Sequence, residues 1–221
     1  MISPSDASSG LPLVIAGMGL LGLILSASAE ALIARFLPRL GELPAIRIRI
    51  VTATLTALLC CGFALRLSND PALPAFILLA ALGIQLARID LLLHLLPNPL
   101  VLALLVMGFS LFASSTLAGS PWSDILRGAA GGAILFVSYL ILALVSPGSI
   151  GLGDVKLAAP VGLYLGYLGW PHLLYGALLG LVLNGIFALF LHVRTAPKPA
   201  IEVAHGPSMI AAVAVIALFA S

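Results

Sequence analysis

Long apolar segments separated by short polar turns make up most of this chain and restrict the folds open to it. Of its 221 residues, 62% are hydrophobic and only 8% are charged, unlike a soluble globular domain. A helix needs about 20 apolar residues to cross a bilayer. The sequence therefore predicts an all-α polytopic membrane protein of about eight transmembrane helices, at residues 11–35, 49–67, 72–89, 97–117, 125–145, 155–169, 171–191 and 207–220.

Positive side chains fall almost entirely on one side of these predicted spans. Lys and Arg concentrate in short cytoplasmic loops. Only Arg66 and Arg127 depart from the pattern. We therefore expect both termini outside the cell membrane and the odd-numbered loops in the cytoplasm. The eight positive residues at those loops are Arg35, Arg39, Arg47, Arg49, Arg88, Lys156, Arg194 and Lys198.

The sequence contains no sign of a second domain, so we expect residues 1–221 to form one membrane-embedded domain. Residues 1–10 have no Lys or Arg and lack the positive region of a signal peptide, which predicts a flexible extracytoplasmic tail and a retained first span. A net charge of +2 without a basic patch excludes nucleic-acid binding. Cys60 and Cys61 have no second pair with which to bind zinc, and we interpret them as packing residues.

Two aspartates each lie at the cytoplasmic end of a predicted span. Asp90 follows the third span, and Asp154 precedes the sixth. Charge at such a depth is costly and usually functional. Amide hydrolysis by two carboxylates needs one ionised group to activate water and one protonated group to polarise the carbonyl, and two acids in a poorly solvated space divide these roles. The pair predicts a hydrolase site that faces the cytoplasm.

Each aspartate also has an explanation without catalysis. Asp154 could cap the helix that follows, because aspartate is favoured at helix N-termini. Asp90 could extend to the interface beside Arg88. Gly151 and Gly153 would let the backbone turn without Cβ clashes and let a substrate strand pass close to Asp154.

Several other polar residues near the aspartates have two interpretations. Lys156 could steer a substrate or act only as a positive-inside anchor. His94 would share a helical face with Asp90 if that helix continued, and the simpler interpretation is an interfacial side chain. His192 and His205 flank the last cytoplasmic loop but do not lie on one helical turn, so we expect no metal there.

Small and acidic residues also occur inside the spans. Glu30 lies in the first span, and we expect it to pair with Arg35 or to reach the interface. Glycines within spans are expected where helix backbones approach closely, and they occur at positions 17, 19, 22, 128, 131, 132 and 185.

Taken together, two segments resemble the motifs of a known family. The segment that begins at Asp90 ends in Leu-Pro-Asn-x-Leu, and GLGDVKL follows at residues 151–157. In these segments the chain resembles the type IV prepilin peptidases, which are bacterial intramembrane aspartyl proteases. The short sequence His205-Gly206-Pro207 before the last apolar run resembles the final loop of that family.

The resemblance implies that Asp90 and Asp154 are the two catalytic carboxylates. The family removes a short, basic, cytoplasmic leader from prepilin-like precursors, cutting after a glycine and before a hydrophobic helix. It therefore implies a prepilin or pseudopilin precursor as partner and a location in the bacterial inner membrane. We expect no metal in the reaction, and we expect a substrate-binding or site-shaping role for Pro97, Asn98, Gly151, Gly153, Lys156, Gly206 and Pro207.

The chain departs from the family pattern in two places. Bifunctional members carry a loop with two Cys-x-x-Cys pairs and methylate the new amino terminus with S-adenosylmethionine. The segment from Leu37 to Ile46 leaves little room for such a loop and has no cysteine, so we expect neither the methylation nor the cofactor. Leu92 and Leu93 replace residues that are often polar in the family, which would suit a specialised substrate or an inactive relative.

Two other classes of protein compete with this assignment. Presenilin-like proteases share the GxGD motif but pair it with Tyr-Asp and with Pro-Ala-Leu, whereas here Ile89 precedes Asp90 and no such tripeptide occurs. A polytopic scaffold or transporter would use its acids to cap helices or relay protons. Proton relay predicts acids spread through the bilayer rather than gathered on one side.

Overall fold

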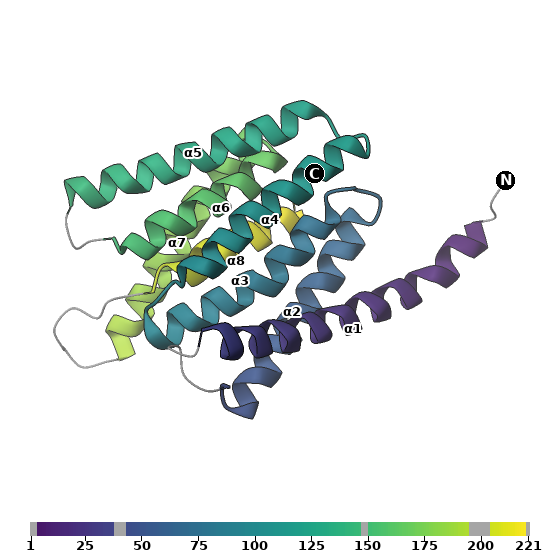
Figure 1. Cartoon of the computed structure of the whole chain (residues 1–221), viewed down its shortest axis with the longest axis horizontal. Helices are drawn as coiled ribbons and strands as arrows, with labels where there is room; N and C mark the ends of the chain where they lie inside the picture. The colour runs from purple at the N-terminus through teal and green to yellow at the C-terminus, as the bar shows by residue number, and fades with distance from the viewer. Residues whose placement is uncertain (1–3, 38–42, 147–149, 195–203, 220–221) are drawn as a thin grey trace. The chain divides into compact units, whose positions relative to one another are not determined.

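The computed structural model describes residues 4–37, 43–146, 150–194 and 204–219, and all regular structure in these ranges is α-helical (Figure 1). This confirms the predicted fold class. Most ends lie within a few residues of the predicted spans. The described helices are α1 (Pro4–Phe36), α2 (Ile46–Leu67), α3 (Leu73–Leu93), α4 (Asn98–Leu117), α5 (Trp122–Val145), α6 (Leu152–Leu168), α7 (Trp170–Arg194) and α8 (Gly206–Phe219).

Six of these helices, namely α1 to α5 and α7, are long and apolar enough to cross a membrane. The chain is therefore a polytopic membrane protein. The largest difference from the predicted spans lies at the first helix, which begins at Pro4. Residues 4–10, predicted as a flexible tail, are thus helical in the structure.

The sixth and eighth helices are the shortest of the described helices, and much of α6 is buried. Helix α6 has 17 residues and α8 has 14, fewer than the roughly 20 needed to span a bilayer. Residues 161–167 of α6 are all buried, and this helix contacts α4, α5, α7 and α8. A helix covered by protein on several sides does not need to match the hydrocarbon core along its whole length.

The described chain divides into two compact units, with the boundary inside α3. The first unit is Met1–Gln85 and the second is Leu86–Ser221. Asp90 and Asp154 both belong to the second unit. The prediction of one membrane domain stays a prediction.

In the first unit, α1 packs against α2 through small residues. A Cβ added to Gly22 would lie 2.6 Å from the Cα of Ala57, so only glycine allows this approach. The thiols of Cys60 and Cys61 are free, and the Cys61 Sγ lies 3.4 Å from the Ile15 carbonyl oxygen. Both cysteines pack at this helix pair, as predicted.

Glu30 is buried in the first unit and joins α1 to α2. Its carboxylate accepts a hydrogen bond of 2.9 Å from Arg49 Nε and one of 2.7 Å from Thr52 Oγ1, and it is only 2% exposed. The predicted partner, Arg35, was therefore wrong. A buried carboxylate needs a partner that packs beside it, and the neighbouring helix provides one.

In the second unit, α5 and α6 run side by side and meet through glycines (Figure 1). A Cβ on Gly131 would lie 2.6 Å from the Gly162 carbonyl oxygen, and one on Gly166 would lie 2.8 Å from the Arg127 carbonyl oxygen. The predicted close approach therefore occurs at positions 22, 128, 131 and 132. It does not occur at Gly17 or Gly185, where no heavy atom would lie within 4 Å of a Cβ.

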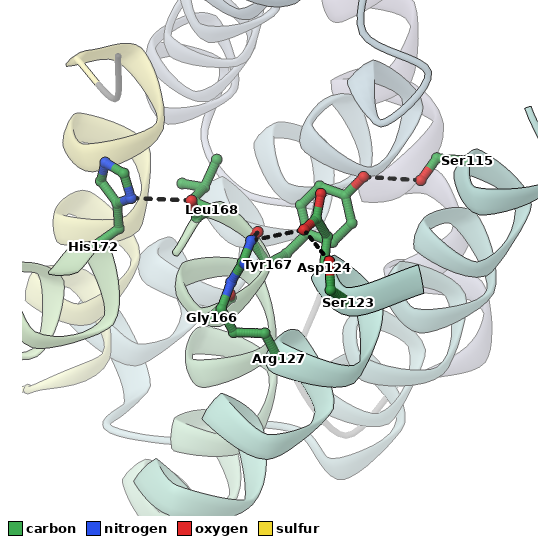
Figure 2. Close-up of polar contacts among 8 residues, drawn as sticks. All are labelled: Ser115, Ser123, Asp124, Arg127, Gly166, Tyr167, Leu168 and His172. Atoms are coloured by element: carbon green, nitrogen blue, oxygen red, sulfur yellow. Dashed lines mark hydrogen bonds and ion pairs between the residues drawn. The ribbon is translucent and has the colours of Figure 1, made fainter. Parts of the chain in front are cut away.

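Arg127 of α5 holds the C-terminal end of α6 (Figure 2). Its Nε donates to the Gly166 carbonyl at 2.8 Å, and one terminal nitrogen donates to the Tyr167 carbonyl at 2.7 Å. The same nitrogen lies 3.1 Å from Asp124 Oδ1. A cation at this end complements the helix dipole and satisfies carbonyls that have no partner within the helix. This role explains an arginine that breaks the positive-inside pattern.

Candidate active site

Asp90 is a buried carboxylate in the last turn of α3. Its side chain is only 5% exposed, so it does not extend to the surface as the interfacial alternative required. One oxygen, Oδ2, accepts a hydrogen bond of 3.0 Å from the backbone N–H of Gly206. Gly206 is the first residue of α8, where unpaired amides and the helix dipole favour a negative charge.

Helix α3 ends immediately after this carboxylate. His94 adopts a left-handed backbone with φ +50°, and its N–H closes the last turn on the Asp90 carbonyl at 2.9 Å. Its side chain is exposed. Because the helix stops at Leu93, His94 does not continue the face that carries Asp90. The chain then turns through Pro97, the N-cap of α4.

Asp154 lies in the first turn of α6 and is half-buried. The N-cap of this helix is Gly151, so Asp154 does not occupy the N-cap position that the explanation without catalysis predicted. A Cβ on Gly151 would lie 3.4 Å from Asp154 Oδ2, so the carboxylate is oriented back towards this glycine. Gly151 has φ −68°, a backbone angle that any residue can adopt. The absence of a Cβ at Gly151 therefore matters because it leaves space beside the carboxylate.

The first turn of α6 packs against the connection between α3 and α4. A Cβ on Gly153 would lie 3.1 Å from Leu96 Cβ. Three residues further on, Lys156 Nζ donates to Asn98 Oδ1 at 3.0 Å, and both side chains are exposed. The structure thus brings the two predicted motifs into contact, and Lys156 has a specific partner in addition to any anchoring role.

The start of α8 lies between Asp90 and α6. A Cβ on Gly206 would lie 2.7 Å from Asp90 Oδ2 and 3.4 Å from Leu157 Cδ2. Leu157 is buried one turn beyond Asp154 on α6. Pro207 follows at the second position of α8, where its missing N–H breaks no helical hydrogen bond. Gly206 therefore allows three segments to meet at the Asp90 carboxylate.

Two buried residues of this region were not predicted to have a site role. Tyr139 of α5 and His205, each 8% exposed, share a hydrogen bond of 2.8 Å between the tyrosine hydroxyl and Nε2. Their rings stack with centroids 5.7 Å apart. The sequence feature that could have indicated a site role was the position of His205 directly before Gly206-Pro207.

His205 has no exposed metal-binding edge. Ser208 Oγ lies 3.3 Å from Nδ1 and donates to the His205 carbonyl at 2.6 Å. Burial lowers the pKa of this imidazole below its usual value, which favours the neutral ring. His192 is exposed on α7. Among the described residues, no group of three His, Cys, Asp or Glu side chains could hold a metal ion.

These features define a class of protein: an all-helical, polytopic membrane protein in which two sequence-distant acidic motifs pack together at helix ends. The chain belongs to the type IV leader peptidase family, whose family model matches residues 76–189, just over half of its length. The matched region includes Asp90 and Asp154 and ends before His205 and Gly206. Searches of the curated proteins and of the solved structures found no match.

Proposed function

We propose that this member of the leader peptidase family is an aspartyl endopeptidase that removes the cytoplasmic leader of prepilin or pseudopilin precursors. One observation carries the proposal. The buried Asp90 carboxylate accepts the Gly206 amide at 3.0 Å, beside the α6 turn that bears Asp154. Two carboxyl groups that share a poorly solvated space would divide into a base and a proton donor, and the contact between the two acidic motifs supports such sharing.

The reaction follows from that division. One ionised carboxylate takes a proton from a water molecule, whose oxygen attacks the scissile carbonyl, while the protonated carboxylate donates to the carbonyl oxygen. Transfer of a proton to the leaving amine then allows the C–N bond to break. The two aspartates titrate as a pair, so we do not assign the base and the acid individually.

The remaining site residues have shaping roles in this proposal. Gly151, Gly153 and Gly206 leave space for backbone approach, and Pro97 starts α4 at the turn beyond Asp90. Asn98 and Lys156 hold the two motifs together at the exposed rim. Pro207 starts α8 behind Gly206.

We propose that the protein resides in the bacterial inner membrane with this site facing the cytoplasm, where a leader peptide is accessible. The apolar helices support the membrane location, and the distribution of Lys and Arg supports the orientation. We propose no metal and no S-adenosylmethionine in the reaction, because peptide cleavage by two carboxylates needs neither.

Purified protein incubated with a prepilin tests the proposal. Asp90→Asn and Asp154→Asn should each abolish leader release, measured by mass spectrometry, because either change removes a proton-transfer group while keeping the side-chain shape. Asp70→Asn is the matched control, since Asp70 accepts the Ala72 N–H at 2.8 Å and asparagine can do the same. Full cleavage by either site variant, or no cleavage by the unmodified protein, would contradict the assignment and favour a scaffold or inactive relative.

A further inference from the structure

The hydrogen bond between Tyr139 and His205 connects helix α5 to the segment that binds Asp90. His205 directly precedes Gly206, so the position of the His205 backbone determines where the Gly206 amide points. That backbone is held on one side by Ser208, which donates to its carbonyl at 2.6 Å. On the other side, the His205 ring is held by Tyr139 at 2.8 Å.

The same tyrosine lies on the helix that packs against the second acidic motif. Helix α5, which carries Tyr139, contacts α6, which carries Asp154, through the glycines described above. The hydrogen bond from Tyr139 therefore links the α5–α6 pair to the segment that binds Asp90. The leader peptidase match ends at residue 189, so His205 lies beyond the matched region.

Because Tyr139 and His205 are buried, losing the hydrogen bond between them would be energetically costly. Tyr139 and His205 are both shielded from solvent, and a buried polar group that loses its partner keeps the full cost of its desolvation. The two side chains therefore constrain one another more strongly than an exposed pair would. A shift of their contact would move the Gly206 amide relative to Asp90.

We propose that Tyr139 and His205 are positioning residues for leader cleavage, whose hydrogen bond holds the Gly206 amide on Asp90. This inference rests on the proposed function. Neither residue takes part in proton transfer to the substrate. Their loss should lower kcat and leave KM nearly unchanged, because the misplacement affects the reacting groups rather than the substrate-binding rim.

Three single variants test which contact matters. Tyr139→Phe keeps the ring and removes the hydroxyl, and we expect kcat to fall by about tenfold or more with KM within about twofold. His205→Gln can place its side-chain amide where Nε2 lies, and this variant should retain most of the cleavage activity of the unmodified protein. His205→Asn can reach only the position of Nδ1, next to Ser208, and should resemble Tyr139→Phe.

A double variant distinguishes the loss of the directional contact from the cost of leaving a buried polar group unpaired. Tyr139→Phe with His205→Phe removes both polar partners while keeping two stacked rings, and should recover stability because no buried group is left unpaired. It should still cleave slowly, because the directional contact is lost. Tyr175→Phe, at an exposed tyrosine on α7, is the control and should cleave as the unmodified protein does.

Each outcome bears on one of the two proposals. Cleavage by the Asp90→Asn or Asp154→Asn variant overturns the proposed function. If those variants are inactive while Tyr139→Phe and His205→Asn cleave at the unmodified rate, only the positioning role is overturned. It is also overturned if kcat falls only in proportion to the folded fraction, measured by thermal unfolding in detergent, or if the double variant cleaves at the unmodified rate.

Discussion

Gly206 is the residue at which a single added methyl group would directly displace the Asp90 carboxylate. The Cβ of Gly206→Ala would lie 2.7 Å from Asp90 Oδ2, which is the end of a flexible side chain. The carboxylate can move aside, but it then loses its amide contact, and a buried carboxylate without that partner also lowers stability. We expect cleavage per folded molecule to fall at least about tenfold, with the folded fraction measured by thermal unfolding.

A methyl group at Gly180 provides the matched control for this variant. A Cβ there would face α8 at ordinary distances, 3.7 Å from both Ala212 Cβ and Met209 Cα. Gly180→Ala should therefore cleave normally. A Gly206→Ala protein with unchanged leader cleavage would show that the amide contact has no role in the reaction.

At the residue scale, the sequence identifies the charged groups but not their partners. Asp90 and Asp154 were recognisable because charge is rare in this chain. The sequence predicts Arg35, in the same helix, as a partner of Glu30, whereas in the structure Arg49 on the next helix is its partner. Such contacts depend on how helices are rotated against each other, which a hydropathy pattern does not determine.

The glycine contact between α5 and α6 determines how closely these helices approach. The Cβ of Gly131→Ala would lie 2.6 Å from the carbonyl oxygen of Gly162 and 3.0 Å from the Cα of Gly166. Both are backbone atoms, so relief requires the helices to separate. We expect a loss of about 1–3 kcal/mol in unfolding free energy, measured by denaturant titration in detergent.

Gly185→Ala on α7 is the control for this helix contact, because its Cβ would meet no heavy atom within 4 Å. It should be neutral or stabilising by up to about 1 kcal/mol, since alanine favours helix more than glycine does. Equal unfolding free energies for the two variants would contradict a tight α5–α6 contact.

At the scale of helices, the sequence predicts the positions of most helices within a few residues. Apolar length and the turns rich in Pro, Gly and Asn placed the spans. The glycines of α6 that contact Gly131, namely Gly162 and Gly166, are not among the predicted contact positions, because hydropathy does not show which glycines face another helix. Helix α6 also begins at Leu152 rather than at residue 155, because its N-cap is Gly151 and Asp154 lies inside the helix.

At the scale of the whole molecule, the proposed orientation in the membrane rests on the distribution of arginines and lysines and can be measured directly. In a background in which Cys60 and Cys61 are replaced by alanine, a single cysteine at the exposed Asn69 or Ala118 should react with a membrane-impermeant maleimide in cells with a permeabilised outer membrane. A cysteine at Leu152, which is 68% exposed, should react only after the inner membrane is opened. The reverse pattern would place the proposed site outside.

Helix α6 is shorter than the hydrocarbon layer that surrounds the protein. Its 17 residues rise about 26 Å, against a hydrocarbon thickness of about 30 Å. Arg127 holds its C-terminal end to α5, so we expect the shortfall at the end that bears Asp154. Because neighbouring helices cover α6, we expect this shortfall to leave a recess through which solvent reaches the carboxylates from that end, and cleavage should slow in bilayers with longer acyl chains.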